Sequence, residues 1–285
     1  MDYFKIAPSL LLGSFVVSSL SAQTVAYYDF EGGSFSSTGG SAGDLTSVGT
    51  NSSINTPFSN ISFGGEDANS NAKVLYADNS SNAFSADAFT IEVLFQYQGQ
   101  SDVLASTFDS VNSTSSGTGI GWLFGTRGAE NGLWFAYSSN GSDSQRVDIY
   151  SDNVSNNTLN MTNGNYYYAA LAVDLSDTSA SGINFFLQDI TTDGNSLLSV
   201  GATHAANRSS IYDTGTEFTI GDIANVTVLG GSASGVNYTG PIDAVRYSNA
   251  QLGVSDLLVN VPEPSSFALI AGALGLASVM LRRRR

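Results

Sequence analysis

The stretch Phe89–Tyr97 constrains the fold most, because apolar residues occupy every second position along it. Glu92 and Gln96 lie between them, so one face of an extended strand would be apolar and the other polar. Leu94 is the one apolar residue on the polar side. This alternation predicts a long β-strand with one face in a hydrophobic core.

Shorter segments of the same kind recur along the chain, separated by stretches rich in Gly, Asn and Asp. Further strands are predicted at Val25–Phe30, Ala72–Ala77, Ile120–Gly125, Leu133–Tyr137, Arg146–Tyr150, Tyr166–Leu175, Gly182–Ile190, Glu217–Gly221, Val226–Leu229 and Ile242–Tyr247. Before the C-terminal region no segment shows a helical apolar stripe. The pattern predicts an all-β protein built as one two-sheet antiparallel sandwich.

Loops and turns are predicted from local composition. Ser34–Ser53 and Asp109–Gly119 are rich in Gly, Ser and Thr or Asn, which indicates long loops. Asn140-Gly141 and Asp193-Gly194 are hairpin signals, because these residues tolerate the positive φ that tight reverse turns require.

The C-terminus has three parts in a fixed order. Val261, Pro262, Glu263 and Pro264 lead into an uncharged run of about 17 residues, near the lower limit for a membrane-spanning helix. The chain ends on Arg282, Arg283, Arg284 and Arg285, which favour the cytoplasmic side of a membrane and argue against a buried helix. We therefore expect a transmembrane helix with the body of the protein outside the cytoplasm, and a plain membrane anchor is the alternative.

The N-terminus predicts export. Lys5 precedes the apolar segment Ile6–Leu20, and a cleavage site fits after Ala22, or after Ser21. The predicted organisation is a signal peptide with a signal helix at residues 1–22, a sandwich at 23–258 and a tail at 259–285.

The tail resembles the PEP-CTERM sorting motif of Gram-negative bacteria, in which the four residues 261–264 precede a short helix and a basic cluster. The resemblance implies processing by an exosortase-type enzyme and insertion in the inner membrane before processing. It also implies a final place in the cell envelope, at the cell surface or outside the cell.

Composition excludes several classes of function. The net charge is −15, and the body is more acidic than the terminal arginines suggest. Between residues 23 and 261 the basic residues are Lys73, Arg127, Arg146, Arg208 and Arg246. Such a body repels nucleic acid, so no nucleic-acid partner is expected. Because cysteine is absent, thiol nucleophiles, zinc–thiolate sites and iron–sulfur clusters are excluded as well.

Catalytic patterns are missing from the sequence. Glycoside hydrolysis needs two carboxylates flanking the scissile bond, but the glutamates here are isolated, Glu92 among them. His204 is the only histidine, and no Gly-x-Ser-x-Gly motif could supply a nucleophile for it. We therefore expect no catalytic residues and no enzymatic activity.

The body resembles the laminin-G-like branch of the concanavalin A-like jelly-roll superfamily. Its motifs, in chain order, are Tyr28-Asp29-Phe30, Phe89–Tyr97, Tyr166–Leu187, Phe218–Gly221 and Gly240–Tyr247, whereas Gly99–Ser155 shows no correspondence. The resemblance implies a jelly roll, and it keeps a carbohydrate-active hydrolase open as an alternative, because the superfamily includes glycoside hydrolases.

The resemblance also implies a structural calcium ion that bridges the first and last strands. Asp29, Glu31 and Asp243 match the positions that would bind it. Their alternatives are ordinary ones: Asp29 would face solvent, and Asp243 would accept backbone hydrogen bonds or pair with Arg246.

Glycan binding requires aromatic rings on an open face. Trp122, Trp134, Tyr137 and Tyr150 form the richest aromatic cluster and are the stacking candidates, with core packing as the alternative. The expected role is non-catalytic adhesion, matrix association or glycan binding near extracellular polysaccharide. A structural surface protein without a ligand is the remaining alternative.

Overall fold

The computed structural model describes residues 24–30, 33–48, 52–56, 59–62, 74–108, 119–129, 131–151, 159–191, 199–200, 204–215, 217–223 and 238–258. Several predictions therefore fall outside the described residues. They are the signal peptide with its helix at 1–22, Glu31, the loop at 109–118, the Asp193-Gly194 turn, the strand at 226–229, and the tail at 259–285 with its transmembrane helix.

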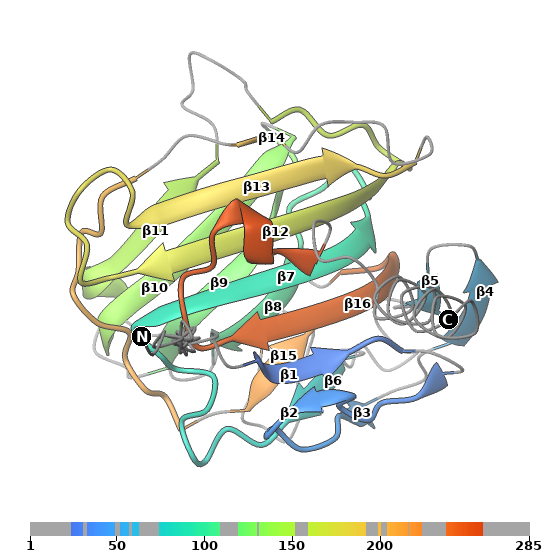
Figure 1. Ribbon diagram of the computed structural model, residues 1–285, viewed down its shortest axis with the longest axis horizontal. Coiled ribbons are helices and arrows are strands. Elements are labelled where there is room, and N and C mark those ends of the chain that lie inside the picture. The colour runs from blue at the N-terminus through green and yellow to red at the C-terminus, as the bar shows by residue number, and fades with distance from the viewer. Residues whose placement is uncertain are drawn as a thin grey trace, which may run out of the picture.

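Two antiparallel sheets stack face to face, as the sequence predicts (Figure 1). The nine-stranded sheet has the order β14-β13-β12-β7-β16-β1-β2, and β4 and β5 join it beside β16. Its strands are β1 (Thr24–Tyr28), β2 (Gly39–Gly40), β4 (Ser52–Thr56), β5 (Ser59–Ser62), β7 (Ala88–Gln96), β12 (Tyr166–Asp174), β13 (Ile183–Asp189), β14 (Ser199–Val200) and β16 (Pro241–Ser248).

The seven-stranded sheet has the order β11-β10-β9-β8-β15-β6-β3. Its strands are β3 (Thr46–Val48), β6 (Val74–Ala77), β8 (Val103–Phe108), β9 (Ile120–Arg127), β10 (Gly132–Gly141), β11 (Arg146–Tyr150) and β15 (Phe218–Ile220). All the strand pairings in both sheets are antiparallel.

The core lies between the sheets and is rich in aromatic rings. The alternating residues of β7 all point into it, and Phe89 and Phe95 are 0% and 1% exposed. Phe89 packs on Trp122 of the facing sheet and on Tyr247 of β16, with ring centroids 5.1 and 5.4 Å apart. The alternation at 89–97 therefore placed the central strand and its inward face correctly.

Three sequence predictions differ from the structure. β4, β5, β8 and β14 were not predicted, and β2 and β3 lie inside the segment Ser34–Ser53 that was expected to be a loop. Asn140 and Gly141 end β10 instead of forming the turn, which the 3₁₀ helix η2 (Asp143–Gln145) makes. Only Gly141 of the two has a positive φ, whereas a two-residue type I′ turn requires it at both positions.

Besides η2, a short 3₁₀ helix η3 spans Val254–Asp256. No helix in the part of the chain that the structure describes is long and apolar enough to cross a membrane.

Candidate functional site

Two of the four aromatic stacking candidates lie in the core. The Trp122 side chain is 0% exposed, and its Nε1 donates a hydrogen bond to the Phe84 carbonyl at 2.7 Å. Tyr137 is also 0% exposed, and its hydroxyl accepts hydrogen bonds from the backbone N–H groups of Asn207 and Arg208 at 3.1 and 3.0 Å. Neither ring is accessible to a sugar, so both residues have the alternative role of core packing.

Trp134 and Tyr150 lie on the outer face of the seven-stranded sheet. They are directly opposite each other in the pairing of β10 with β11, so their side chains project from the same face. Both are half-buried, whereas their neighbours Leu133 and Phe135 point into the core. The sequence could not separate them from Trp122 and Tyr137, because all four residues lie in strands with alternating apolar positions.

Three charged side chains surround these two rings. The Arg127 guanidinium lies over the Tyr150 ring, 4.2 Å from its centroid, and the Arg146 guanidinium lies 5.5 Å from the Trp134 centroid. Asp148 accepts hydrogen bonds from Trp134 Nε1 at 2.9 Å and from Arg146 Nη2 at 2.7 Å. We call Trp134, Tyr150, Arg127, Arg146 and Asp148 the aromatic platform.

The platform contributes little to stability through its ion pair. The Arg146 and Asp148 side chains are 24% and 33% exposed, and pairs in such positions stabilise a fold by about 0–1 kcal/mol. These contacts hold hydrogen-bond donors and acceptors beside two aromatic rings.

The outer face of the nine-stranded sheet is covered by the chain itself. Residues 249–258, which we call the strap, follow β16 and fold back across β7 and β12, and η3 lies over β12 in Figure 1. Leu252 and Leu257 pack there in an apolar cluster with Tyr168, Ala170 and Phe186, and Leu94 packs against it. Leu94, the exception in the alternating pattern, is apolar because the strap covers it.

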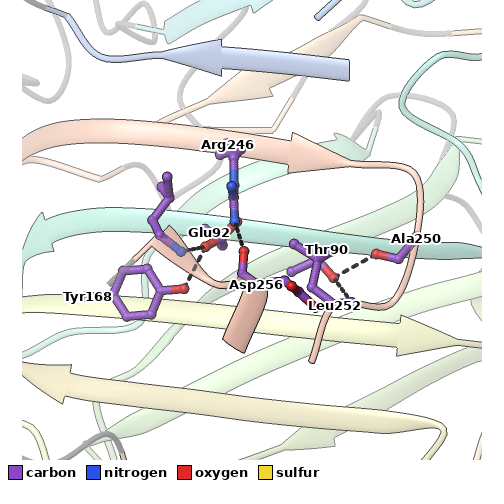
Figure 2. Close-up of polar contacts among 8 residues, drawn as sticks. Thr90, Glu92, Tyr168, Arg246, Ala250, Leu252 and Asp256 are labelled. Atoms are coloured by element: carbon purple, nitrogen blue, oxygen red, sulfur yellow. Dashed lines mark hydrogen bonds and ion pairs between the residues drawn. The ribbon is translucent and has the colours of Figure 1, made fainter. Parts of the chain in front are cut away.

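A buried ion pair lies beneath the strap (Figure 2). Glu92 is 0% exposed and pairs through Oε2 with Nε of Arg246. Its Oε1 accepts hydrogen bonds at 2.7 Å from the Tyr168 hydroxyl and from the backbone N–H of Leu258. Both carboxylate oxygens are thus satisfied, as a buried charge requires.

Further hydrogen bonds attach the strap along its length. Arg246 Nη2 donates to the Asp256 carbonyl at 2.8 Å. The Thr90 hydroxyl donates to the Ala250 carbonyl and accepts from the Leu252 N–H, both at 2.8 Å (Figure 2). The strap is therefore held against the sheet by hydrogen bonds up to Leu258, two residues before residue 260.

The calcium candidates are only partly described. Asp29, which directly follows β1, and Asp243 on the adjacent β16 are both half-buried. Burial first, and then these two carboxylates, raise the pKa of the Tyr27 hydroxyl. Glu31 lies outside the described residues. Arg246, the alternative partner of Asp243, is paired with Glu92. Within the described segments no group of three or more His, Asp or Glu side chains comes together, and a calcium site stays a prediction.

Comparison with known proteins bears on the tail and on the fold. Residues 260–285 match the family model of the PEP-CTERM protein-sorting motif, which implies export to the cell envelope or surface and exosortase processing. No curated protein matches the sequence.

Solved structures show the same kind of sandwich at low sequence identity. Domain 4 of the extracellular arabinanase AbnA from Geobacillus stearothermophilus, solved with arabinotriose, is 13% identical; the alignment covers 84% of this chain and 97% of that domain, with a TM-score of 0.50. The binding domain of botulinum neurotoxin serotype C1 is 14% identical over 84% of this chain and 51% of its own length, with a TM-score of 0.51. The chain thus joins a PEP-CTERM sorting motif to a β-sandwich that is similar in fold to these two domains.

Proposed function

We propose that this protein is an exported, non-catalytic carbohydrate-binding protein of the envelope or extracellular matrix, and that it contacts glycans with the aromatic platform. The observation that carries the proposal is the cross-strand pair Trp134–Tyr150 on an outer sheet face, bordered by Arg146 and Asp148. Aromatic rings stack on the C–H faces of sugars, and fixed charged groups bond the hydroxyls. The fold likeness to an arabinanase domain that was solved with an arabinan fragment supports the proposal only as an analogy.

Two of the described carboxyl groups, Glu92 and Asp102, are buried and closed to a substrate. Glu92 is fully buried and paired with Arg246. Asp102 is 2% exposed, and burial raises the pKa of its carboxyl to about 7, although a hydrogen bond from Gln100 opposes the shift. A general acid must reach the glycosidic oxygen, and neither group is accessible to a substrate.

His204 has a structural position. Its Nε2 lies 2.8 Å from the Tyr150 carbonyl oxygen, and its ring packs edge-on against Phe185. The backbone of His204 also pairs with Ile183 at the start of β13. These contacts fix the segment after β14 against the sandwich. In this proposal the imidazole packs and hydrogen-bonds, and it does not act as a general base.

The proposal is tested by a glycan array with the full chain in mild detergent, with and without calcium. We expect binding to a subset of glycans, and a loss of about tenfold in affinity in Trp134→Ala and in Tyr150→Ala, since each removes a stacking ring. Trp122→Phe is the matched control, because it changes a buried ring and should leave glycan affinity unchanged. An array without any bound glycan would leave the ligand-free surface protein as the better proposal.

A further inference from the structure

A pocket of about 370 Å³ lies at one edge of the sandwich, and no residue of the aromatic platform lines it. Ser139 at the end of β10 and Thr178 in the turn between β12 and β13 line it on the sheet side. Ala206, Asn207, Arg208 and Ser209 close it from the segment 204–215, which runs down this edge beside the ends of both sheets (Figure 1). Leu175, which is fully buried, gives it an apolar floor.

The pocket exists because segment 204–215 is held to the sandwich by specific hydrogen bonds. The Tyr212 N–H donates to the Ser138 carbonyl at 2.8 Å, and the Ile211 N–H donates to Asp87 Oδ1 at 2.8 Å. The backbone of Arg208 contacts the Tyr137 hydroxyl, as described above. The position of the Arg208 backbone is therefore fixed independently of its side chain.

The Arg208 side chain has unused hydrogen-bonding capacity. Its Nη1 donates to the Asn207 carbonyl at 3.1 Å, whereas its Nε is buried and has no hydrogen-bond partner. Arg208 makes no ion pair with any of the residues that the structure describes. A buried guanidinium N–H without an acceptor is costly, and a carboxylate is the group that matches its geometry.

The acidic residues of the neighbouring turn are already occupied. Asp177 accepts hydrogen bonds from the Ser179 N–H at 2.8 Å and from the Ser181 hydroxyl at 2.7 Å. Asp174 accepts from the N–H and the hydroxyl of Ser176 at 2.9 and 2.6 Å. These local contacts hold both carboxylates within their own turn. The Arg208 guanidinium is therefore available to the carboxylate of a ligand.

We propose that this pocket binds a sugar acid, with the carboxylate on the Arg208 guanidinium. The hydroxyls of Ser139, Thr178 and Ser209 and the amide of Asn207 would bond the sugar hydroxyls. The volume lies in the range of small-ligand sites, about 300–1,000 Å³. The ligand is either a free uronic acid or a uronic acid unit at the end of a polysaccharide, since both present the same carboxylate and ring.

Binding is measured by the thermal shift of the full chain in mild detergent and by calorimetry. The probes are glucuronate, an oligosaccharide ending in glucuronate, methyl glucoside and acetate. Both glucuronate probes should raise Tm, and the neutral sugar and acetate should bind at least about tenfold more weakly, because each lacks half of the contacts. Tighter binding of the oligosaccharide would identify a chain end as the natural ligand, and equal binding would identify the free acid.

Three variants decide the assignment. Arg208→Gln should lower glucuronate affinity about tenfold or more, and Arg208→Lys should restore only part of it, because an ammonium lacks the planar fork. Trp134→Ala should leave glucuronate binding unchanged, which separates this site from the platform. The proposal would be overturned if Arg208→Gln kept both its glucuronate affinity and its Tm. Equal affinity for methyl glucoside and glucuronate, or no glucuronate binding at millimolar concentration, would also overturn it.

Discussion

Glu92 on β7 lies directly opposite Arg246 on β16, and the two side chains pair beneath the strap. Because Glu92 also bonds Tyr168 and Leu258, its carboxylate joins two neighbouring strands and the strap at one point. Taking charges out of water is expensive, so such a pair depends on both partners being present.

Glu92→Gln should therefore lower the free energy of unfolding by about 3–5 kcal/mol, because it leaves the Arg246 guanidinium buried without a counter-charge. Urea unfolding at pH 7 measures the loss. The double variant Glu92→Gln/Arg246→Met should recover part of it, since no buried charge remains. Equal stability of Glu92→Gln and the wild type would show that the ion pair is dispensable.

Leu257→Ala should loosen the strap. Leu257 is 0% exposed against the outer face of the nine-stranded sheet, and truncating a buried Leu costs about 2–5 kcal/mol. In Leu257→Ala, amide hydrogen exchange of residues 249–258 should become faster than in the wild type. Exchange of the core strands should increase less. Val254→Ala is the control, because Val254 is 46% exposed in the same strap and should change nothing. Identical exchange in the two variants would contradict this role for Leu257.

The strap also shows what the sequence could and could not predict. The alternating pattern of β7 predicted its inward face, but it gave no sign that Glu92 on the opposite face is buried. Periodicity within a strand cannot reveal that a segment far along the chain covers the other face. Leu94 was the one signal, because an apolar residue on a polar face needs a partner.

The aromatic residues illustrate a second limit. Trp122 and Trp134 occur in similar strands, yet one is in the core and the other on the outer face. Trp122 is directly opposite Tyr137 and shares its inner face, whereas Trp134 lies three residues before Tyr137 on β10 and so faces outward. β8 was missed for a related reason: Val103–Phe108 is buried on both faces and so does not alternate. The Arg208 pocket had no signal at all in the sequence, since its residues come from three separate segments.

Asp102 should make stability depend on pH. Its carboxyl has a pKa of about 7 in the folded protein, against about 3.9 when unfolded. The unfolded chain thus loses this proton first, so the stabilisation present below about pH 4 is lost as the pH rises through about 7. The loss is of the order of 4 kcal/mol at 1.36 kcal/mol per pKa unit.

Asp102→Asn should flatten the fall in stability between pH 4 and pH 7, as measured by urea unfolding across that range. Asp177→Asn is the control of opposite sign, because hydrogen bonds from Ser179 and Ser181 lower the pKa of the Asp177 carboxyl. Its contribution is present at neutral pH and is lost in acid. The assignment to Asp102 fails if Asp102→Asn keeps the wild-type slope.

Calcium should raise Tm if Asp29 and Asp243 bind it. At a free concentration of 100 times Kd the stabilisation would be about 2.7 kcal/mol, and EDTA should remove it. Asp243→Asn should abolish the shift, whereas Asp78→Asn, in an exposed turn, should keep it. A Tm that is insensitive to both calcium and EDTA would exclude the site.

The path of the strap decides how the protein responds to being pulled. Tension applied at residue 260 would enter at Leu258, through its hydrogen bond to Glu92, and so reach β7 and β16 in the middle of the nine-stranded sheet. A pull on the C-terminal end would therefore load the middle of the nine-stranded sheet and not one of its edges.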